Sequence, residues 1–260
     1  MNKKFSTIYF LGLSLAKRDI AAQYRQTYLG YVWAVLPPFV MSLTFMFLNS
    51  TGVVNVSDND ISYPVYVFTG TIFWQMFCDC INNPMKAIIT NKQLLTKIDF
   101  PREALIFEAF LNTCFSFLIK LVLLIIVLIF FDADLSLHSF ASMIPIFSLF
   151  LIGFFIGISL IPLGALYDDV QFAMPIILGF LIFFMPVLYV PPSGSQFNFI
   201  YDLNPISILL MSIRDTLYGN DFDSLLYPII FSVILLFFLI PLSIKIYKII
   251  APHLIERMEA

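Results

Sequence analysis

The chain has 260 residues, of which 60% are hydrophobic and only 12% are charged, and its formal net charge is −3. So much apolar surface is more than one soluble core can bury, which excludes an ordinary soluble globular domain. We therefore expect an all-α polytopic membrane protein.

Six segments reach or approach the roughly 20 apolar residues that a helix needs to cross a bilayer. They are Gly30–Ser50, Tyr63–Ile81, Ala104–Phe131, Phe140–Tyr167, Phe172–Tyr189 and Leu225–Ile250. The third, fourth and sixth exceed that length, so they should tilt or project from the hydrocarbon. The chain is thus predicted to be one transmembrane domain, 1–260. Its parts are an interface helix (1–29), spans one to five (30–189), extracytoplasmic helices (190–224), span six (225–250) and a cytoplasmic tail (251–260).

The distribution of basic residues predicts that both termini are cytoplasmic. With that orientation the inner segments hold twelve of the fourteen Lys and Arg residues, while the outer loops are acidic. The inner turn with Asp168 and Asp169 lacks a base, but acids count little in this rule.

The first 29 residues predict an amphipathic helix rather than a removable signal peptide, because charges interrupt the apolar run. At 100° per residue, one face carries Leu13, Ala16, Ile20 and Tyr24. The opposite face would present its cations to lipid phosphates. The proposed contacts with a lipid pyrophosphate are Lys17, Arg18 and Arg25. The alternative is a juxtamembrane basic segment that only fixes topology.

The join to the first span contains Gly30, which permits a sharp bend. Pro37 and Pro38 are placed near the start of that span, where a missing N–H costs least.

The loop from Asn82 to Glu103 is long for a connector. Thr90 and Gln93 form a capping box that predicts a helix through about Ile98, before Pro101. Its apolar face, which includes Leu94 and Leu95, calls for a covering protein surface. The alternative is a helix that folds back on the permease itself.

The outer segment Val190–Ser224 predicts a helix too short to span, capped by Asn204 with Pro205 at its first turn and Gly219 after its end. A cation at Arg214 needs a partner, and we expect Asp215, Asp202 or a phosphate. The alternative is a periplasmic loop with an interfacial anchor.

Aromatic residues make up 17% of the chain, more than packing between spans requires. Their faces suit sugar rings, so we propose a glycan channel. The candidates are Phe39, Phe45 and Phe47 on span one, with Phe180, Phe183, Phe184 and Tyr189 on span five. The alternative is that they face lipid. Pro175 and Pro186 bracket span five and are expected to let it yield.

Ionisable residues within spans are functional candidates by default: Asp79, Glu108 and Lys120. The alternative for Asp79 and Glu108, near the cytosolic ends of their spans, is that they only reach water. We expect Lys120 to snorkel outward and to pair with an acid on another span, and the alternative is that it lines a hydrated channel.

The sequence argues against an enzyme or a metal site. It has no G-x-x-x-x-G-K-[ST] loop, so any nucleotide must bind a partner. His138 and His253 are far apart, and Cys78, Cys80 and Cys114 have the character of small hydrophobes. A transferase acting on lipid-linked sugars is the remaining enzyme alternative.

Three stretches, RDIAAQYRQTYLGYVWAVLPP, NKQLLTKIDFPREA and NPISILLMSIRDTLYG, resemble the permease subunits of bacterial ABC-2 type polysaccharide exporters. The resemblance covers essentially the whole chain. One departure is Tyr167–Val170, Tyr-Asp-Asp-Val, where Arg-Asp is common in the family.

The resemblance implies a homodimer in the bacterial inner membrane that recruits two ATP-binding subunits, which carry ATP and Mg²⁺. It implies no cofactor on this chain and no nucleic-acid partner. Membrane lipid and a lipid-linked glycan would be its ligands, the glycan moving from the cytoplasmic to the periplasmic side. Alternatives are an ABC-2 exporter of a small lipid or drug, and an ion-coupled flippase without an ATPase.

The resemblance also assigns roles to residues. The coupling helix that docks on the ATPase would comprise Thr90, Asn91, Lys92, Gln93, Leu94, Leu95, Lys97 and Ile98. The gate over the channel exit would include Phe197, Phe199, Tyr201 and Arg214.

Overall fold

A computed structural model describes residues 2–25, 28, 30, 32–52, 62–97, 101–131, 137–190, 198–218 and 225–259, and across these ranges the ordered elements are helices without a strand. In chain order they are α1 (Asn2–Arg25), α2 (Val32–Ser50), α3 (Tyr63–Thr90), α4 (Lys92–Lys97), α5 (Glu103–Phe130), the 3-10 helix η1 (Leu137–Ser142), α6 (Met143–Leu166), α7 (Asp168–Leu181), the 3-10 helix η2 (Ile182–Phe184), α8 (Asn198–Leu203), α9 (Pro205–Leu217) and α10 (Leu226–Glu259). The all-α prediction is confirmed over these ranges.

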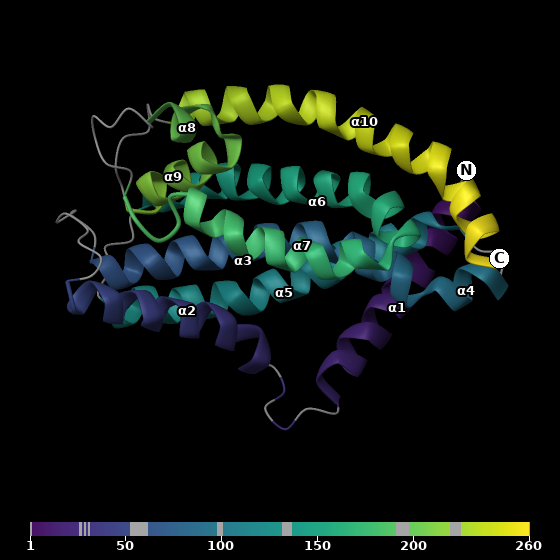
Figure 1. Cartoon of the computed structure of the whole chain (residues 1–260), viewed down its shortest axis with the longest axis horizontal. Coiled ribbons are helices and arrows are strands. Elements are labelled where there is room, and N and C mark those ends of the chain that lie inside the picture. The colour runs from purple at the N-terminus through teal and green to yellow at the C-terminus, as the bar shows by residue number, and fades with distance from the viewer. Residues whose placement is uncertain are drawn as a thin grey trace.

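Helices α2, α3, α5, α6, α7 and α10 run lengthwise through the molecule (Figure 1). Helix α4 and both chain ends lie at one end of this bundle, and α8 and α9 lie at the other. By length and composition, the described helices long and apolar enough to cross a membrane are Glu103–Phe130, Ser139–Leu166 and Leu226–Ile249, with Val35–Ser50 a shorter apolar helix. The third, fourth and sixth predicted spans are therefore supported directly, while six crossings remain a prediction.

Helix α3 forms the centre of the bundle, because every residue from Val65 to Trp74 is buried. It packs most extensively on α6 and α5. Two glycines on α6 permit the close approach: a Cβ at Gly153 would meet Cys80 Cβ at 2.9 Å, and one at Gly157 would meet the Cys80 carbonyl oxygen at 2.6 Å. Small residues four apart are the usual means of bringing membrane helices together.

Two predicted helix boundaries were wrong. Helix α3 continues beyond Ile81 to Thr90, so Thr90 ends a helix and does not cap the next one. Helix α7 ends at Leu181, and after η2 the chain is irregular, because Pro186 lacks an N–H and forces Met185 into an extended conformation. Helix α10 contains the predicted sixth span and continues as a helix to Glu259.

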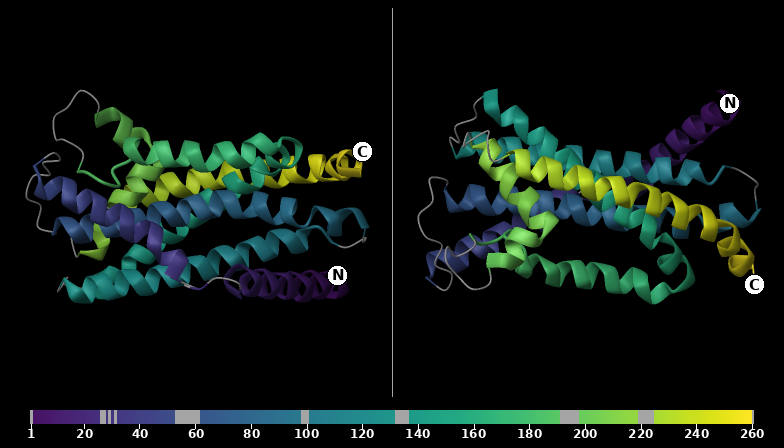
Figure 2. Two further views of the ribbon diagram at one scale, coloured as in Figure 1. Left: turned by 60° about the horizontal axis from the view of Figure 1, so that its bottom comes forward. Right: turned by 90° about the horizontal axis from the view of Figure 1, so that it is seen from above.

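The join between α1 and α2 is partly as predicted. Gly30 adopts a positive φ of 50°, the left-handed conformation that favours glycine. Pro37 and Pro38, however, lie inside α2 rather than in its first turn, because α2 begins at Val32. Figure 2 shows α1 lying outside the lengthwise bundle, at the end that carries α4.

Candidate functional site

Polar side chains of α3 and α5 face each other toward the α1 end of the bundle. On α3 they recur at Asp79, Asn83 and Lys86, and on α5 at Glu108, Asn112 and Ser116, spacings that place each set on one helix face. Asn83 donates from Nδ2 to Thr113 Oγ1 at 2.9 Å, which joins the two helices.

An ion pair links the same helices. Lys120 Nζ lies 2.5 Å from Asp79 Oδ2. The lysine side chain is only 6% exposed, whereas the aspartate is 33% exposed. A buried cation of this kind requires a partner, so the predicted pairing of Lys120 with an acid on another span is confirmed.

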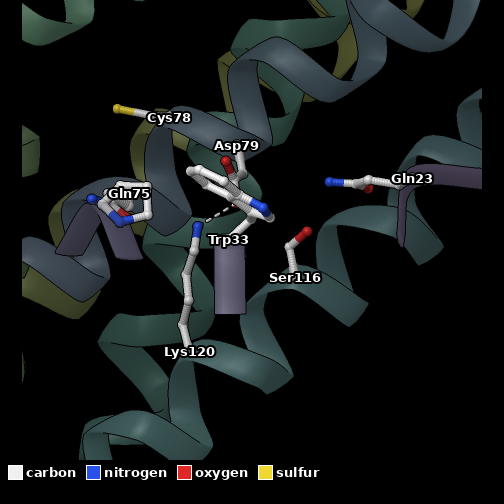
Figure 3. Close-up of a pocket in the computed structure, with 8 residues that line it drawn as sticks. Gln23, Trp33, Gln75, Cys78, Asp79, Ser116 and Lys120 are labelled. Carbon is white, nitrogen blue, oxygen red and sulfur yellow. Dashed lines mark hydrogen bonds and ion pairs between the residues drawn. The ribbon is translucent and has the colours of Figure 1, made fainter. Parts of the chain in front are cut away.

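A cavity of about 280 Å³ opens beside this pair (Figure 3). Its lining residues come from four helices: Gln23 of α1, Trp33 and Pro37 of α2, Gln75, Cys78 and Asp79 of α3, and Ser116 and Lys120 of α5. In Figure 3, Gln23 and Gln75 lie on opposite sides of the ion pair, with Trp33 beside it.

A second cavity, of about 460 Å³, shares Gln23, Asp79 and Ser116 with the first and continues toward Lys86 and Thr90. Glu108 lines it and is 1% exposed. One of its oxygens accepts a hydrogen bond from Asn112 Nδ2. Glu108 Oε2 and Asn112 Oδ1 are buried and have no partner in the described part of the chain. Such orphaned acceptors call for a ligand or water that donates to them.

Helix α1 borders the second cavity through Asp19 and Ala22. It packs on α5 through Leu15 and Ala16, which are buried. Gly12 allows this contact, because a Cβ there would meet Phe107 Cδ1 at 2.8 Å. Ala16 belongs to the predicted apolar face of this helix and is fully buried. Protein, rather than lipid, therefore covers the face at this residue.

The predicted phosphate contacts differ in their surroundings. Arg18 donates from Nε to Asp19 Oδ1 at 2.5 Å and from Nη2 to Asn91 Oδ1 at 2.6 Å, so its guanidinium joins α1 to the α3–α4 junction. The hydrogen bond with Asp19 is the main reason that the pKa of Arg18 is raised. Lys17 is exposed, and the side chain of Arg25 lies outside the described residues.

Helix α4 begins at Lys92, directly after the end of α3. Asn91 is shared by both elements, because its carbonyl oxygen accepts from the N–H groups of Leu94 and Leu95 at 3.0 Å. Leu94 and Leu95 are half-buried against the core, so the permease itself covers part of the apolar face predicted to await a partner. Lys92 is exposed; the side chains of Gln93 and Lys97, and all of Ile98, lie outside the described residues.

The aromatic channel candidates lie on α2, on α7 and η2, and on the segment after η2. The rings of Phe45 and Phe183 are 6.5 Å apart, which joins α2 to η2. Five of the seven candidates are more than 40% exposed: Phe39, Phe47, Phe180, Phe183 and Phe184. Phe45 and Tyr189 are half-buried, and Tyr189 donates to or accepts from Tyr201 at 2.9 Å.

At the other end of the bundle, Asn204 caps α9 as predicted, its Oδ1 accepting from the Ile206 N–H at 3.0 Å. Gly219 and Phe197, and the side chain of Phe199, lie outside the described residues.

The prediction for Arg214 was wrong. Its guanidinium donates to the carbonyl oxygens of Pro186, Val187 (2.7 Å) and Tyr66 (3.3 Å), and it stacks 3.7 Å from the Tyr66 ring. These partners replace the carboxylates and phosphate that the sequence suggested. Burial raises the pKa of the neighbouring Asp215 carboxyl.

Sequence reasoning missed Gln23, Gln75 and Ser116 as cavity residues. A signal was available for two of them, because a spacing of four places Gln75 with Asp79 on α3 and Ser116 with Asn112 on α5. Only the packing of the helices adds Gln23 of α1 to them. Gly70 was also missed, although it makes the room that Arg214 occupies, since a Cβ there would lie 2.0 Å from Arg214 Nη2.

Comparison with known proteins gives a consistent result. The sequence model of the ABC-2 type transporter family matches residues 12–218. An O-antigen export system permease protein, RfbA, of Klebsiella pneumoniae is 24% identical over 218 residues, 83% of each chain. The protein of the same name from Myxococcus xanthus is 25% identical over 80% of each chain. The polysialic acid transport protein KpsM of Escherichia coli is 25% identical over 86% of this chain and 88% of its own. This chain belongs to the ABC-2 type transporter family of membrane proteins.

Proposed function

We propose that this chain is the permease subunit of an ATP-driven exporter that moves a lipid-linked polysaccharide out of the cytoplasm across the bacterial inner membrane. One observation carries the proposal: relatives named for O-antigen export and for polysialic acid transport each match at least 80% of this chain. The family match, residues 12–218, includes α4, α9 and most of α1.

The permease acts as a homodimer, with each copy bound to one ATP-binding subunit that carries ATP and Mg²⁺. The exposed aromatic residues of α2 and α7 support this arrangement. In a dimer that joins these two helices, Phe39, Phe47, Phe180 and Phe184 would border a shared path, along which sugar rings slide over aromatic faces.

The ATPase binds at α4. Helix α4 lies at the end of the bundle that carries both chain termini, which the basic residues predict to be cytoplasmic (Figure 1). Its exposed Lys92 and its contacts with α3 and α10 suit it to pass movement from a partner to two long helices. Helices α8 and α9 would form the gate at the opposite, periplasmic end.

The test is reconstitution. The permease is co-purified with the ATPase encoded beside it and placed in proteoliposomes with a fluorescent lipid-linked glycan. We expect glycan transfer that requires ATP and both subunits. Transfer by the permease alone would favour an ion-coupled flippase. ATP-driven transfer of small lipids without glycan would favour a lipid or drug exporter.

The α4 contact is tested by cross-linking. In a variant with Cys78, Cys80 and Cys114 changed to Ala, a Lys92→Cys substitution should cross-link to the ATPase. The matched control is Asp202→Cys, because Asp202 is exposed on α8 at the far end. Equal cross-linking from both positions would contradict docking at α4.

A further inference from the structure

The cavity beside Asp79 and Lys120 lies at a definite depth relative to the bilayer. Helix α2 has 19 residues, so it is about 28 Å long, close to the roughly 30 Å of a hydrocarbon core. Trp33 stands at the start of α2 and lines the cavity. Tryptophan is enriched where the hydrocarbon meets the headgroups. The cavity therefore lies at the inner boundary of the hydrocarbon core, next to the headgroup layer and short of the α4 end of the bundle.

Helix α3 gives the same depth independently. It crosses from Tyr63 toward Thr90, and Asp79 lies 16 residues from its start. That distance corresponds to about 24 Å along the helix, most of one hydrocarbon thickness. The more polar part of α3, with Asn82, Asn83 and Lys86, follows beyond this level.

The lining of the cavity suits a ring that carries hydroxyl groups. Gln23 and Gln75 offer amides that both donate and accept, Ser116 offers a hydroxyl and Asp79 a carboxylate. Trp33 lines the cavity and is 52% exposed, so its indole is available to a ligand there. An apolar face edged by a few polar groups, with donors and acceptors mixed, matches a pyranose, whose C–H face is apolar and whose rim is polar.

The charge of the cavity disfavours an anion. Asp79 neutralises Lys120 at 2.5 Å. The adjoining cavity has three acids, Asp19, Asp79 and Glu108, against one base, Lys86. The buried acceptors without partners, Glu108 Oε2 and Asn112 Oδ1, would gain from hydroxyl donors and would repel a phosphate.

We propose that the cavity lined by Trp33, Gln75 and Asp79 is a subsite for a sugar ring of the lipid-linked glycan, held at the inner boundary of the hydrocarbon core before export. The inference rests on the proposed function, because that function supplies a sugar on a lipid at this depth. The lipid's own phosphates remain outside the cavity, and the carrier chain stays in the bilayer.

Binding to the full-length permease in nanodiscs tests the subsite. The chain has two tryptophans, and Trp74 is buried, so a Trp74→Phe background leaves Trp33 as the only reporter. The probes are a polyprenyl pyrophosphate that carries one hexose, from a panel of hexoses, and the same carrier without sugar. We expect a sugar-bearing carrier to change Trp33 emission and to bind at least about tenfold more tightly than the bare carrier.

Two variants assign that advantage to the cavity. Gln75→Leu removes an amide and leaves the ion pair intact, whereas Asp79→Asn removes the carboxylate. Each should reduce the sugar-dependent advantage to less than about threefold without weakening binding of the bare carrier. The matched control is Gln171→Leu, because Gln171 lies on α7 and bonds to Asp168 instead.

Three outcomes would overturn the inference: equal binding of every sugar-bearing carrier and the bare carrier, an advantage that survives both variants, or free hexose binding as tightly as the lipid-linked form. The last would assign the cavity to a soluble sugar. Failure of the proposed function is distinguishable, because ATP-driven export is measured separately. If export occurs but the sugar-bearing carrier binds no more tightly than the bare carrier, only the subsite is contradicted. If the sugar-bearing carrier binds more tightly but no export occurs, only the exporter proposal is contradicted.

Discussion

The bundle buries two cations at different levels, and it satisfies them in opposite ways. Near α1, Lys120 has a single carboxylate partner, which is partly exposed beside a cavity. Near α9, Arg214 is enclosed by three backbone carbonyls and the Tyr66 ring. A side-chain carboxylate can rotate toward a ligand, but a backbone carbonyl moves only with its chain. The first arrangement suits exchange of ligands, and the second fixes α9 to α3 and to the segment after α7.

The strongest test of this contrast is Arg214→Met. It removes the guanidinium donor from the carbonyls of Tyr66, Pro186 and Val187, and we expect a loss of about 3 kcal/mol in the free energy of unfolding. The measurement is reversible unfolding in mixed micelles. Arg214→Lys keeps the charge but loses the planar guanidinium. Its free energy of unfolding should therefore lie between those of the wild type and of Arg214→Met. A stable Arg214→Met variant would show that the joint is not structural.

Gly70→Ala tests the same joint from its other side. The added Cβ would lie 2.0 Å from Arg214 Nη2 and 2.5 Å from the Val187 carbonyl oxygen. We expect a loss of about 2 kcal/mol, because both neighbours are held in place. Gly179→Ala is the matched control, since nothing lies within 4 Å of its Cβ position. Equal stability of the two variants would contradict a tight joint.

The ion pair near α1 should be weaker. Asp79→Asn leaves Lys120 buried without a carboxylate, and we expect a loss of about 1–2 kcal/mol, less than for a fully enclosed pair because Asp79 reaches the cavity. The double variant Asp79→Asn, Lys120→Met should recover most of the loss. A double-mutant cycle without coupling energy would show that the ion pair does not stabilise the protein.

The smallest effect is expected where α1 meets the α3–α4 junction. Arg18 is partly exposed, so its hydrogen bond to Asn91 should contribute about 0.5–1 kcal/mol. Asn91→Ala also loses the bond from Nδ2 to the Ala87 carbonyl oxygen, which is 2.9 Å long. A cycle with Arg18→Ala separates the two bonds. Coupling above that of Asp79 and Lys120 would reverse the ranking of the contacts at this end.

The sequence predicted those features that depend on residue type and local spacing. Apolar runs of sufficient length gave α5, α6 and α10, and the Asn-Pro pair gave the start of α9. Because a buried lysine needs an acidic partner, the sequence predicted that Lys120 pairs with an acid. It did not identify that acid as Asp79.

The remaining features depend on tertiary packing. The partners of Arg214 are backbone carbonyls, which no residue type marks. The capping box at Thr90 was a real motif in the wrong context, because α3 continued through it. The role of Gln23 and Gln75 in the cavity follows only from the packing of α1 and α3 on α5.

The lengths of the long helices have a mechanical consequence. Helix α3 has 28 residues and α10 has 34, so they are about 42 and 51 Å long and extend well past a hydrocarbon core of about 30 Å. In the proposed exporter, a protein bound at α4 would act on the ends of α3 and α10 that extend beyond the bilayer. A movement there would change the tilt of both helices in the membrane.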